Sequence, residues 1–175
     1  ATLNARKKGI GIKGITWKIA TALIAVEVVT QGILLGLGIV PATAQFIIPI
    51  SGMMIGNAMV LSILFLNRLQ AELEAHEGEI ELILSLGGTP QQAVSRNVKA
   101  AIRASMIPTI EAQKTIGLVQ LPGMMSGQII GGANPVDAVQ FQILIIFALL
   151  TCATLASVIL AALVYPTLFN ERMQY

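Results

Sequence analysis

Four apolar stretches in this chain are long enough to cross a lipid bilayer, and no other feature limits the possible folds as strongly. They cover residues 15–40, 46–66, 105–130 and 136–164. An α-helix rises 1.5 Å per residue, so about 20 residues cross a hydrocarbon core of about 30 Å. Charged residues make up only 11% of the chain, about half the share usual in soluble domains. The sequence therefore predicts an all-α, polytopic membrane protein with about four transmembrane helices.

The third of these stretches is the least regular. Pro108 and Pro122 interrupt it, and Glu111 and Lys114 lie within it. Proline removes a backbone donor and kinks a helix, and the freed backbone groups need protein or water as partners at membrane depth. A broken or re-entrant helix is therefore one interpretation of residues 105–130.

Residues 67–104 form the only long polar segment between two spans. Its first half carries an apolar face at helical spacing, made by Leu69, Leu73, Ile80 and Leu84. Gly87 and Gly88 then interrupt the helix, Thr89 suits the N-cap of the next helix, and Pro90 suits its first turn. The segment therefore predicts two helices joined by a tight turn, a helical hairpin.

The basic residues define an orientation. Ten of the eleven Lys and Arg residues lie in the termini, in the hairpin or at the adjoining helix ends: Arg6, Lys7, Lys8, Lys13, Lys18, Arg68, Arg96, Lys99, Arg103 and Arg172. The short loops near 41–46 and 131–136 contain none. Because cytoplasmic loops are enriched in Lys and Arg, we expect both termini and the hairpin to lie in the cytoplasm.

The hairpin also carries a spacing used by transporters. Glu81 lies six residues before Gly87, as in the E-A-A-x-x-x-G signature of ABC importer permeases, although Leu82 and Ile83 replace the two alanines. This spacing alone also fits a solvated, charged hairpin beside the membrane.

Three longer blocks are more specific. Residues 48–59 (IPISGMMIGNAM), 86–93 (LGGTPQQA) and 114–135 (KTIGLVQLPGMMSGQIIGGANP) resemble the Fet-type iron-export permease family and its plant aluminium-tolerance relatives. The resemblance covers nearly the whole chain. It implies an ABC permease subunit that works as a permease homodimer in the bacterial inner membrane. Members of this family usually carry further membrane helices before the region that matches residue 1, so either such helices precede this chain or this member is a shortened one.

Iron or another metal is the substrate that the resemblance implies, and export the direction. A sugar nucleotide is the rival substrate within the same family. The resemblance also implies that the hairpin couples to a separate ATP-binding subunit, through Glu81, Gly87, Gly88, Thr89, Pro90 and Ala93. The chain lacks the G-x-x-x-x-G-K-[ST] phosphate loop, so ATP and Mg²⁺ are expected in that partner and no cofactor in this chain.

Ionisable and polar residues at membrane depth are candidates for a translocation pathway. Glu27 lies midway along the first span, and Gln31 shares its helix face. A charge inside a membrane costs several kcal/mol, so Glu27 either faces a pathway or forms a structural hydrogen bond. The other candidates are Asn57, Gln128, and the pair Glu111 and Lys114, which is also explained by a local ion pair.

Two methionine pairs, Met53–Met54 and Met124–Met125, lie in glycine-rich apolar segments. Thioethers are soft metal ligands that suit Cu(I) better than iron. Methionine also fills gaps between packed helices, so packing is the simpler explanation.

Several function classes are disfavoured. A net charge of +2 gives no electrostatic basis for nucleic-acid binding, whereas membrane lipid is an expected partner. No nucleophile–base or metalloprotease pattern lies at membrane depth, so an enzyme is not expected. An ATP-independent channel or secondary transporter, or a membrane scaffold, remains the alternative to an ABC permease.

Overall fold

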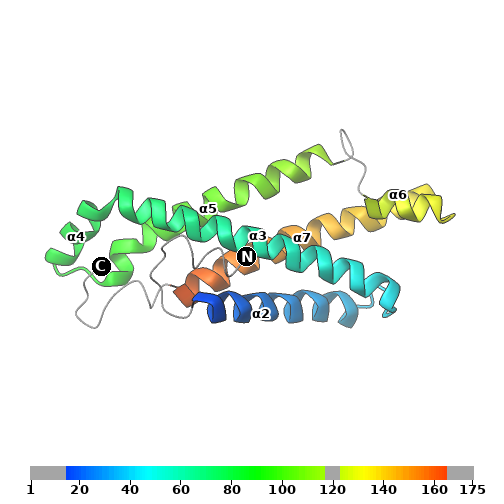
Figure 1. Cartoon of the computed structure of the whole chain (residues 1–175), viewed down its shortest axis with the longest axis horizontal. Helices are drawn as coiled ribbons and strands as arrows, with labels where there is room; N and C mark the ends of the chain where they lie inside the picture. The colour runs from blue at the N-terminus through cyan, green and yellow to red at the C-terminus, as the bar shows by residue number, and fades with distance from the viewer. Residues whose placement is uncertain (1–14, 117–122, 165–175) are drawn as a thin grey trace.

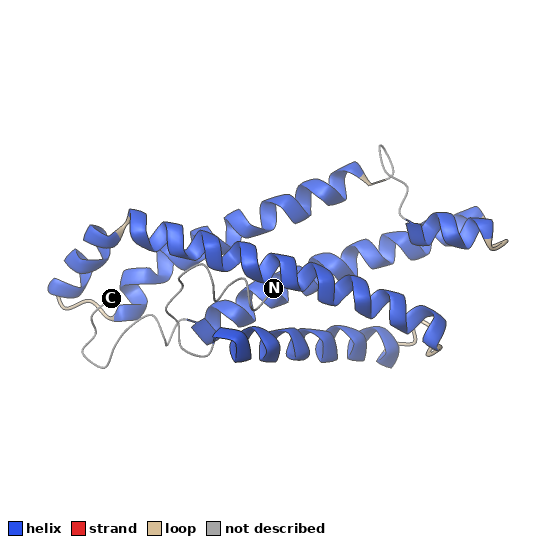
Figure 2. Ribbon diagram, in the orientation of Figure 1, coloured by secondary structure: helices blue, strands red, loops and turns tan. Residues whose placement is uncertain are grey.

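The structure, a computed structural model, describes residues 15–116 and 123–164, and the regular elements in these residues are helices (Figure 2). In chain order they are α2 (Ile15–Gly36), α3 (Ala44–Ala75), α4 (Glu77–Ser85), α5 (Pro90–Thr115), α6 (Gly123–Ile130) and α7 (Pro135–Val164). They form an elongated bundle with α4 at one end and α6 at the other (Figure 1). The predicted all-α fold is confirmed.

Three helices are long and apolar enough to cross a membrane, within the described residues. They are Ile19–Gly36 in α2, Phe46–Ala75 in α3 and Pro135–Val164 in α7. Each corresponds to one of the expected spans. The chain is thus consistent with a polytopic membrane protein.

The expected span 105–130 is not one helix. α5 ends at Thr115 and α6 begins at Gly123, and residues 117–122 lie outside the described part of the chain. The first half of α5 is rich in polar residues, which explains why α5 is not among the apolar spans. Even so, α5 packs along α3 and leads from α4 back toward the end where α6 and α7 begin (Figure 1). Four membrane spans therefore stay a prediction.

The first hairpin helix also has different bounds from those expected. We expected the membrane span to end at Leu66, but α3 continues without a break to Ala75, and α4 follows after a turn at His76. No glycine or proline lies between residues 67 and 75. Leu69 and Leu73 are buried, so packing extends α3 beyond the apolar span.

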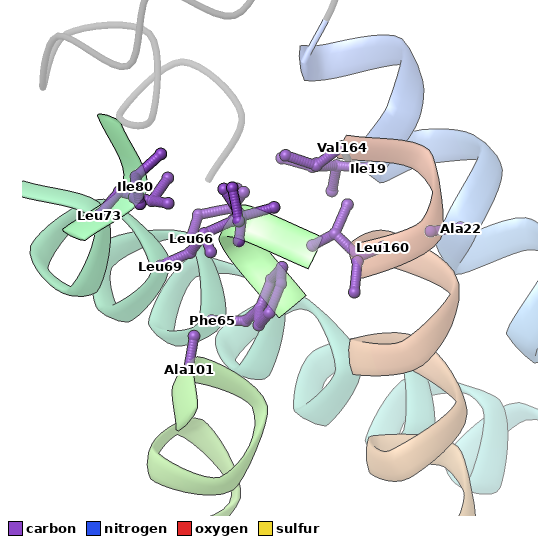
Figure 3. Close-up of a cluster of buried hydrophobic side chains, with 13 residues drawn as sticks. Ile19, Ala22, Phe65, Leu66, Leu69, Leu73, Ile80, Ala101, Leu160 and Val164 are labelled. Atoms are coloured by element: carbon purple, nitrogen blue, oxygen red, sulfur yellow. The ribbon is translucent and has the colours of Figure 1, made fainter. Parts of the chain in front are cut away.

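Buried hydrophobic side chains form two clusters along the bundle. The cluster nearer α4 joins α2, α3, α4, α5 and α7 (Figure 3), and it includes Ile19, Phe65, Leu69, Ile80, Val94 and Leu160. The second cluster includes Val26, Met54, Ala58, Ile145, Cys152 and Ala153. Its small side chains let α3 and α7 approach closely, as is common between membrane helices.

Candidate functional site

The turn between α4 and α5 has a geometry that requires both of its glycines. The amide of Gly87 donates to the carbonyl of Leu84 (3.0 Å), and that of Gly88 donates to the carbonyl of Ile83 (2.9 Å). This is a Schellman cap, which needs a left-handed residue after the helix, and Gly87 has a φ of 83°. A Cβ on Gly88 would lie 2.6 Å from Cγ2 of Ile83 and 2.8 Å from its carbonyl oxygen.

The start of α5 is capped as the sequence predicts. The Thr89 side chain accepts a hydrogen bond from the Gln92 amide (3.3 Å), and the Gln92 side chain accepts one from the Thr89 amide (2.9 Å). Pro90 occupies the first turn. This capping box satisfies backbone donors that the helix itself leaves open. The predicted N-cap is confirmed, and the turn has a defined shape from Leu84 to Gln92.

The predicted coupling residues divide into exposed and buried ones. Glu81, Gly87 and Thr89 are exposed, Gly88 and Pro90 are half-buried, and Ala93 is buried in the core cluster. Ala93 therefore packs the hairpin against the bundle and does not present a surface to a partner. Its role as a coupling residue remains a prediction.

Sequence reasoning missed two residues of this turn region. Leu82 is 59% exposed and Leu86 is 78% exposed, although both are large and apolar. Their spacing of four residues, on the face opposite Ile80, was the available signal. We call the exposed residues Glu81, Leu82, Leu86, Gly87 and Thr89 the hairpin tip.

Hydrogen bonds attach the hairpin to α3. Asn97 of α5 is buried, and its side-chain amide donates to the carbonyl of Glu72 (2.9 Å). Nδ1 of His76, at the α3–α4 turn, lies 2.9 Å from the same carbonyl oxygen. Arg96 forms a more exposed ion pair with Glu79 of α4 (3.0 Å). These contacts link the end of α3 to the turn before α4 and to α5, and they link α4 to α5.

Polar side chains meet halfway along the bundle, between α2, α3 and α7. Gln31 donates to Oγ of Ser51 (2.8 Å), so the predicted polar face of the first span points toward α3. One turn earlier, Oε1 of Glu27 is buried and has no hydrogen-bond partner among the described residues. Glu27 also interacts electrostatically with Cys152 of α7. The side-chain oxygens of Gln113 and Gln142 are also buried without a partner among the described residues, and such atoms are uncommon in folded proteins.

Asn57 and Cys152 link α3 to α7 near this point. The side-chain amide of Asn57 donates to the carbonyl of Leu149 (3.4 Å), and Sγ of Cys152 lies 3.7 Å from the carbonyl oxygen of Met54. Asn57 lies one helical turn after Met54, which Cys152 contacts, and its side chain forms a hydrogen bond between α3 and α7.

The remaining pathway candidates lie elsewhere. Glu111 and Lys114 pair with each other at 2.8 Å on an exposed face of α5. Gln128 lines a cavity of about 580 Å³ at the end of the bundle opposite α4, together with Met124. The structure therefore does not gather the candidates into one site. Whether any of them contacts a substrate stays a prediction.

The two methionines of each pair lie on different faces of their helix and have different surroundings. Met54 is buried in the core and Met124 packs against the same cluster, whereas Met53 is 37% exposed and Met125 is half-buried. No group of three or more His, Cys, Asp or Glu side chains within residues 15–116 and 123–164 is placed to hold a metal ion.

Comparison with known proteins places these features in a family. The chain is 56% identical over 174 residues to the UPF0014 membrane protein YjkA of Bacillus subtilis, which covers 99% of this chain and 70% of YjkA. It is 41% identical over 178 residues to a protein of Escherichia coli named "Probable iron export permease protein FetB", covering 99% of this chain and 67% of FetB. Protein ALUMINUM SENSITIVE 3 of Arabidopsis thaliana is 35% identical over 153 residues, covering 87% and 56% respectively.

The chain thus spans between 56% and 70% of the lengths of these relatives. No solved structure matches it. The family described as "Uncharacterised protein family (UPF0014)" matches residues 1–169. The relatives include a probable iron export permease and a plant aluminium-sensitivity protein, in agreement with the resemblance that the three sequence blocks carry. With apolar helices in its bundle and a match along nearly its whole length, this chain belongs to the UPF0014 family of membrane proteins.

Proposed function

We propose that this chain is the membrane-spanning part of an ABC transporter permease that exports iron or another metal cation, with ATP hydrolysed by a separate subunit. The observation that carries the proposal is the hairpin tip. A rigidly capped turn presents two exposed leucines and Glu81 at one end of a bundle of apolar helices. The name of the relative FetB supports both the substrate and the direction.

The exposed leucines suit a protein partner. Leu86 is more exposed than most apolar residues of the described chain, and it lies at a turn beside polar residues. An apolar side chain rimmed by polar groups marks an interaction site. The partner proposed here is a soluble ATP-binding subunit on the cytoplasmic side of a bacterial inner membrane, where the positive-inside rule would place the hairpin.

Coupling would follow from how the hairpin is attached. Movement of the hairpin tip would pass through the Asn97–Glu72 hydrogen bond into α3, and through the buried residues Ala93 and Val94 into the shared core. The partner must bind the tip differently in two conformations of the bundle, because equal binding shifts no equilibrium. Two copies of the permease, one for each ATPase of a pair, would complete the transporter.

A cation fits the described bundle better than a sugar nucleotide, which carries phosphate charge. The one ionisable carboxylate near the centre of the bundle is Glu27, and no described ion pair neutralises it. A buried carboxylate attracts a cation and repels phosphate. Glu27 is therefore the proposed intramembrane contact of the substrate.

The test is reconstitution of the full-length protein with candidate ATP-binding subunits in proteoliposomes. We expect a stable complex and ATP-dependent movement of iron, whereas a sugar nucleotide should not be moved. Transport that needs an ion gradient and no ATP would contradict the proposal and support the channel or secondary-transporter alternative.

A pair of variants tests the hairpin tip. Leu86→Ser removes an exposed apolar contact, and we expect it to weaken co-purification of the ATPase about tenfold, since an apolar contact of this size contributes about 1.5–3 kcal/mol when buried. Leu37→Ser is the matched control, because Leu37 is also highly exposed (71%) and follows directly after the end of α2 at Gly36, far from the hairpin tip in the chain. Equal effects of both variants would rule out a specific role for the tip.

A further inference from the structure

An ion pair lies on the outside of the bundle, at the edge formed by the last turns of α5 (Figure 1). Nζ of Lys114 lies 2.8 Å from Oε1 of Glu111, and the two side chains are 64% and 61% exposed. The proposed contact of the substrate is the buried Glu27, so this pair has no role in the proposed function. Its depth in the membrane decides what can lie against it.

A contact with α7 fixes this depth. Sδ of Met106 in α5 lies 4.0 Å from Oγ1 of Thr154 in α7, and the two helices run in opposite directions along the bundle (Figure 1). At 1.5 Å per residue, Thr154 lies about 7 Å past the middle of α7 toward the α4 end, and Glu111 lies about 7 Å from Met106 in the other direction. Glu111 is therefore level with the middle of α7, and Lys114 lies about 5 Å beyond it. Both fall within the half-thickness, about 15 Å, of a hydrocarbon core centred on this helix.

Lipid is an unfavourable neighbour for such a pair. Ionised side chains in membrane-spanning helices almost always face the interior of a bundle or a water-filled cavity. Pairing lowers the cost of taking two charges out of water but does not remove it. A water-filled cavity also needs a second wall of protein, so this side of α5 needs a protein neighbour that the described residues do not supply.

The exposed side chains on this side of α5 have the spacing of a helix-packing face. Ile107, Ile110, Glu111 and Lys114 share one strip of the helix surface, because residues three and four positions apart are neighbours on a helix. We call these four residues the α5 stripe. Ile107 is 54% exposed and Ile110 is 39% exposed, whereas Ser105 on the opposite side of α5 is buried. The α5 stripe thus offers an apolar contact and one charge of each sign.

We propose that the α5 stripe is the interface with a second copy of this chain, related by a two-fold axis along the membrane normal. The inference rests on the proposed function, in which α5 crosses the membrane and two permeases form one transporter. Such an axis makes the two α5 helices run side by side in the same direction, so each residue of the stripe meets residues of its own depth in the other copy. Ile107 and Ile110 then pack against their equivalents at the three- and four-residue spacing of paired helices.

The charges of the α5 stripe favour a second copy as the occupant. Glu111 and Lys114 differ in depth by less than one helical turn, so Glu111 of each copy can face Lys114 of the other. The two pairs then form a network of four alternating charges that is neutral as a whole and shielded from lipid. A second copy supplies both charges in the matching order, whereas a purely apolar helix would leave the pair in apolar surroundings.

Cysteine cross-linking in membranes tests the interface. In full-length protein without other cysteines, Ile107→Cys should form a disulfide-linked dimer on oxidation with copper phenanthroline, because the two-fold axis brings the two residues together. Ile24→Cys is the matched control, since Ile24 is similarly exposed (61%) in the apolar part of α2. We expect the control to yield about tenfold less dimer, because its thiols are not held close together. Equal yields from the two variants, or no dimer from Ile107→Cys, would overturn the inference.

Charge exchange between copies tests the identity of the partner. Glu111→Lys gives a copy with two lysines in the α5 stripe, and Lys114→Glu gives a copy with two glutamates, so neither variant keeps an ion pair within itself. Each variant alone should yield about fivefold less Ile107→Cys dimer, because like charges then meet across the interface. Co-expression of the two variants with different tags should restore the mixed dimer to within about twofold of the original yield. Absence of this recovery would overturn the inference, because a pair that acts only inside one copy cannot be repaired by the other.

Cross-linking needs no ATPase, so its outcome can be separated from that of the proposed function. A dimer through Ile107→Cys without ATP-dependent metal transport would overturn the proposed function and support the interface. ATP-dependent transport by a protein that forms no such dimer would overturn the interface and support the proposed function.

Discussion

Gly88 is the single residue whose identity the structure explains most directly. A methyl group there would overlap both the side chain and the carbonyl of Ile83, and the neighbouring Gly87 has a backbone conformation that costs other residues about 1–2 kcal/mol. We expect Gly88→Ala and Gly87→Val to loosen the α4–α5 turn. Faster proteolytic cleavage near residue 87 and ATP hydrolysis without matching transport would be the observable results.

A nearby glycine provides the control for these variants. Gly78 lies inside α4, and a Cβ on it would meet nothing within 4 Å. Gly78→Ala should therefore keep or raise stability, by about 0.5–1 kcal/mol, because alanine loses less backbone entropy in a helix. If Gly78→Ala uncoupled transport as strongly as Gly88→Ala, the turn geometry would not be the cause.

A second prediction for a single residue concerns the charge of Glu27. Because its Oε1 atom is buried without a described partner, Glu27→Gln changes the charge of the central region with little change in shape. We expect transport to slow about tenfold or more, which corresponds to about 1.4 kcal/mol, while the ATPase still binds. Glu74→Gln, on the exposed end of α3, is the control. Normal transport by Glu27→Gln would give this residue a purely structural role.

At the scale of helices, the attachment of α4 and α5 to α3 depends on adjacent residues that differ in burial. Asn97 is buried and donates to the Glu72 carbonyl, whereas the Arg96–Glu79 ion pair is exposed. Asn97→Ala should destabilise the protein by about 1–1.5 kcal/mol, because it removes the hydrogen bond that this buried side chain donates to the part-buried Glu72 carbonyl. Arg96→Ala should cost less than about 1 kcal/mol. Thermal unfolding in detergent would measure both, and an equal loss would contradict the assigned roles.

The helix ends show which features the sequence could predict. Thr89 and Pro90 act through local backbone chemistry, and the structure has the cap that they predict. The end of α3 at Ala75 has no such local marker. Near this end the Glu72 carbonyl accepts a hydrogen bond from Asn97, a residue 25 positions away in the sequence. Tertiary contacts of this kind are invisible to patterns read along one segment.

The candidate site was predictable to a smaller degree, for the same reason. Glu27 was identified because a carboxylate inside an apolar span is costly wherever it lies. The position of Gln128 beside Asp137 at one cavity could not be predicted, because it depends on the turn between α6 and α7. Leu82 and Leu86 share a helix face opposite Ile80, which the sequence shows, but their exposure depends on how α4 packs.

At the scale of the whole molecule, the bundle has two chemically different ends. The α4 end carries Arg96 and Lys99 and the hairpin tip, while the opposite end has two short loops and a cavity with Asp137. Such an asymmetry is the one that the positive-inside rule relates to orientation. It depends on α5 leading the chain back toward the end where α7 begins, so that α5 runs along the bundle beside the three strongly apolar helices α2, α3 and α7.

The single cysteine makes this arrangement testable. Cys152 is buried and is the one cysteine of this chain, so Cys152→Ser, together with replacement of any cysteine outside these 175 residues, leaves a background without thiols. Into it, Ser85→Cys places a thiol on the exposed end of α4, and Ala133→Cys places one on the exposed α6–α7 turn. In intact cells a membrane-impermeant maleimide should label Ala133→Cys, and it should label Ser85→Cys only after lysis. Labelling of both from one side would mean that α5 and α6 do not cross the membrane, and reversed labelling would place the hairpin outside, where no ATPase could drive it.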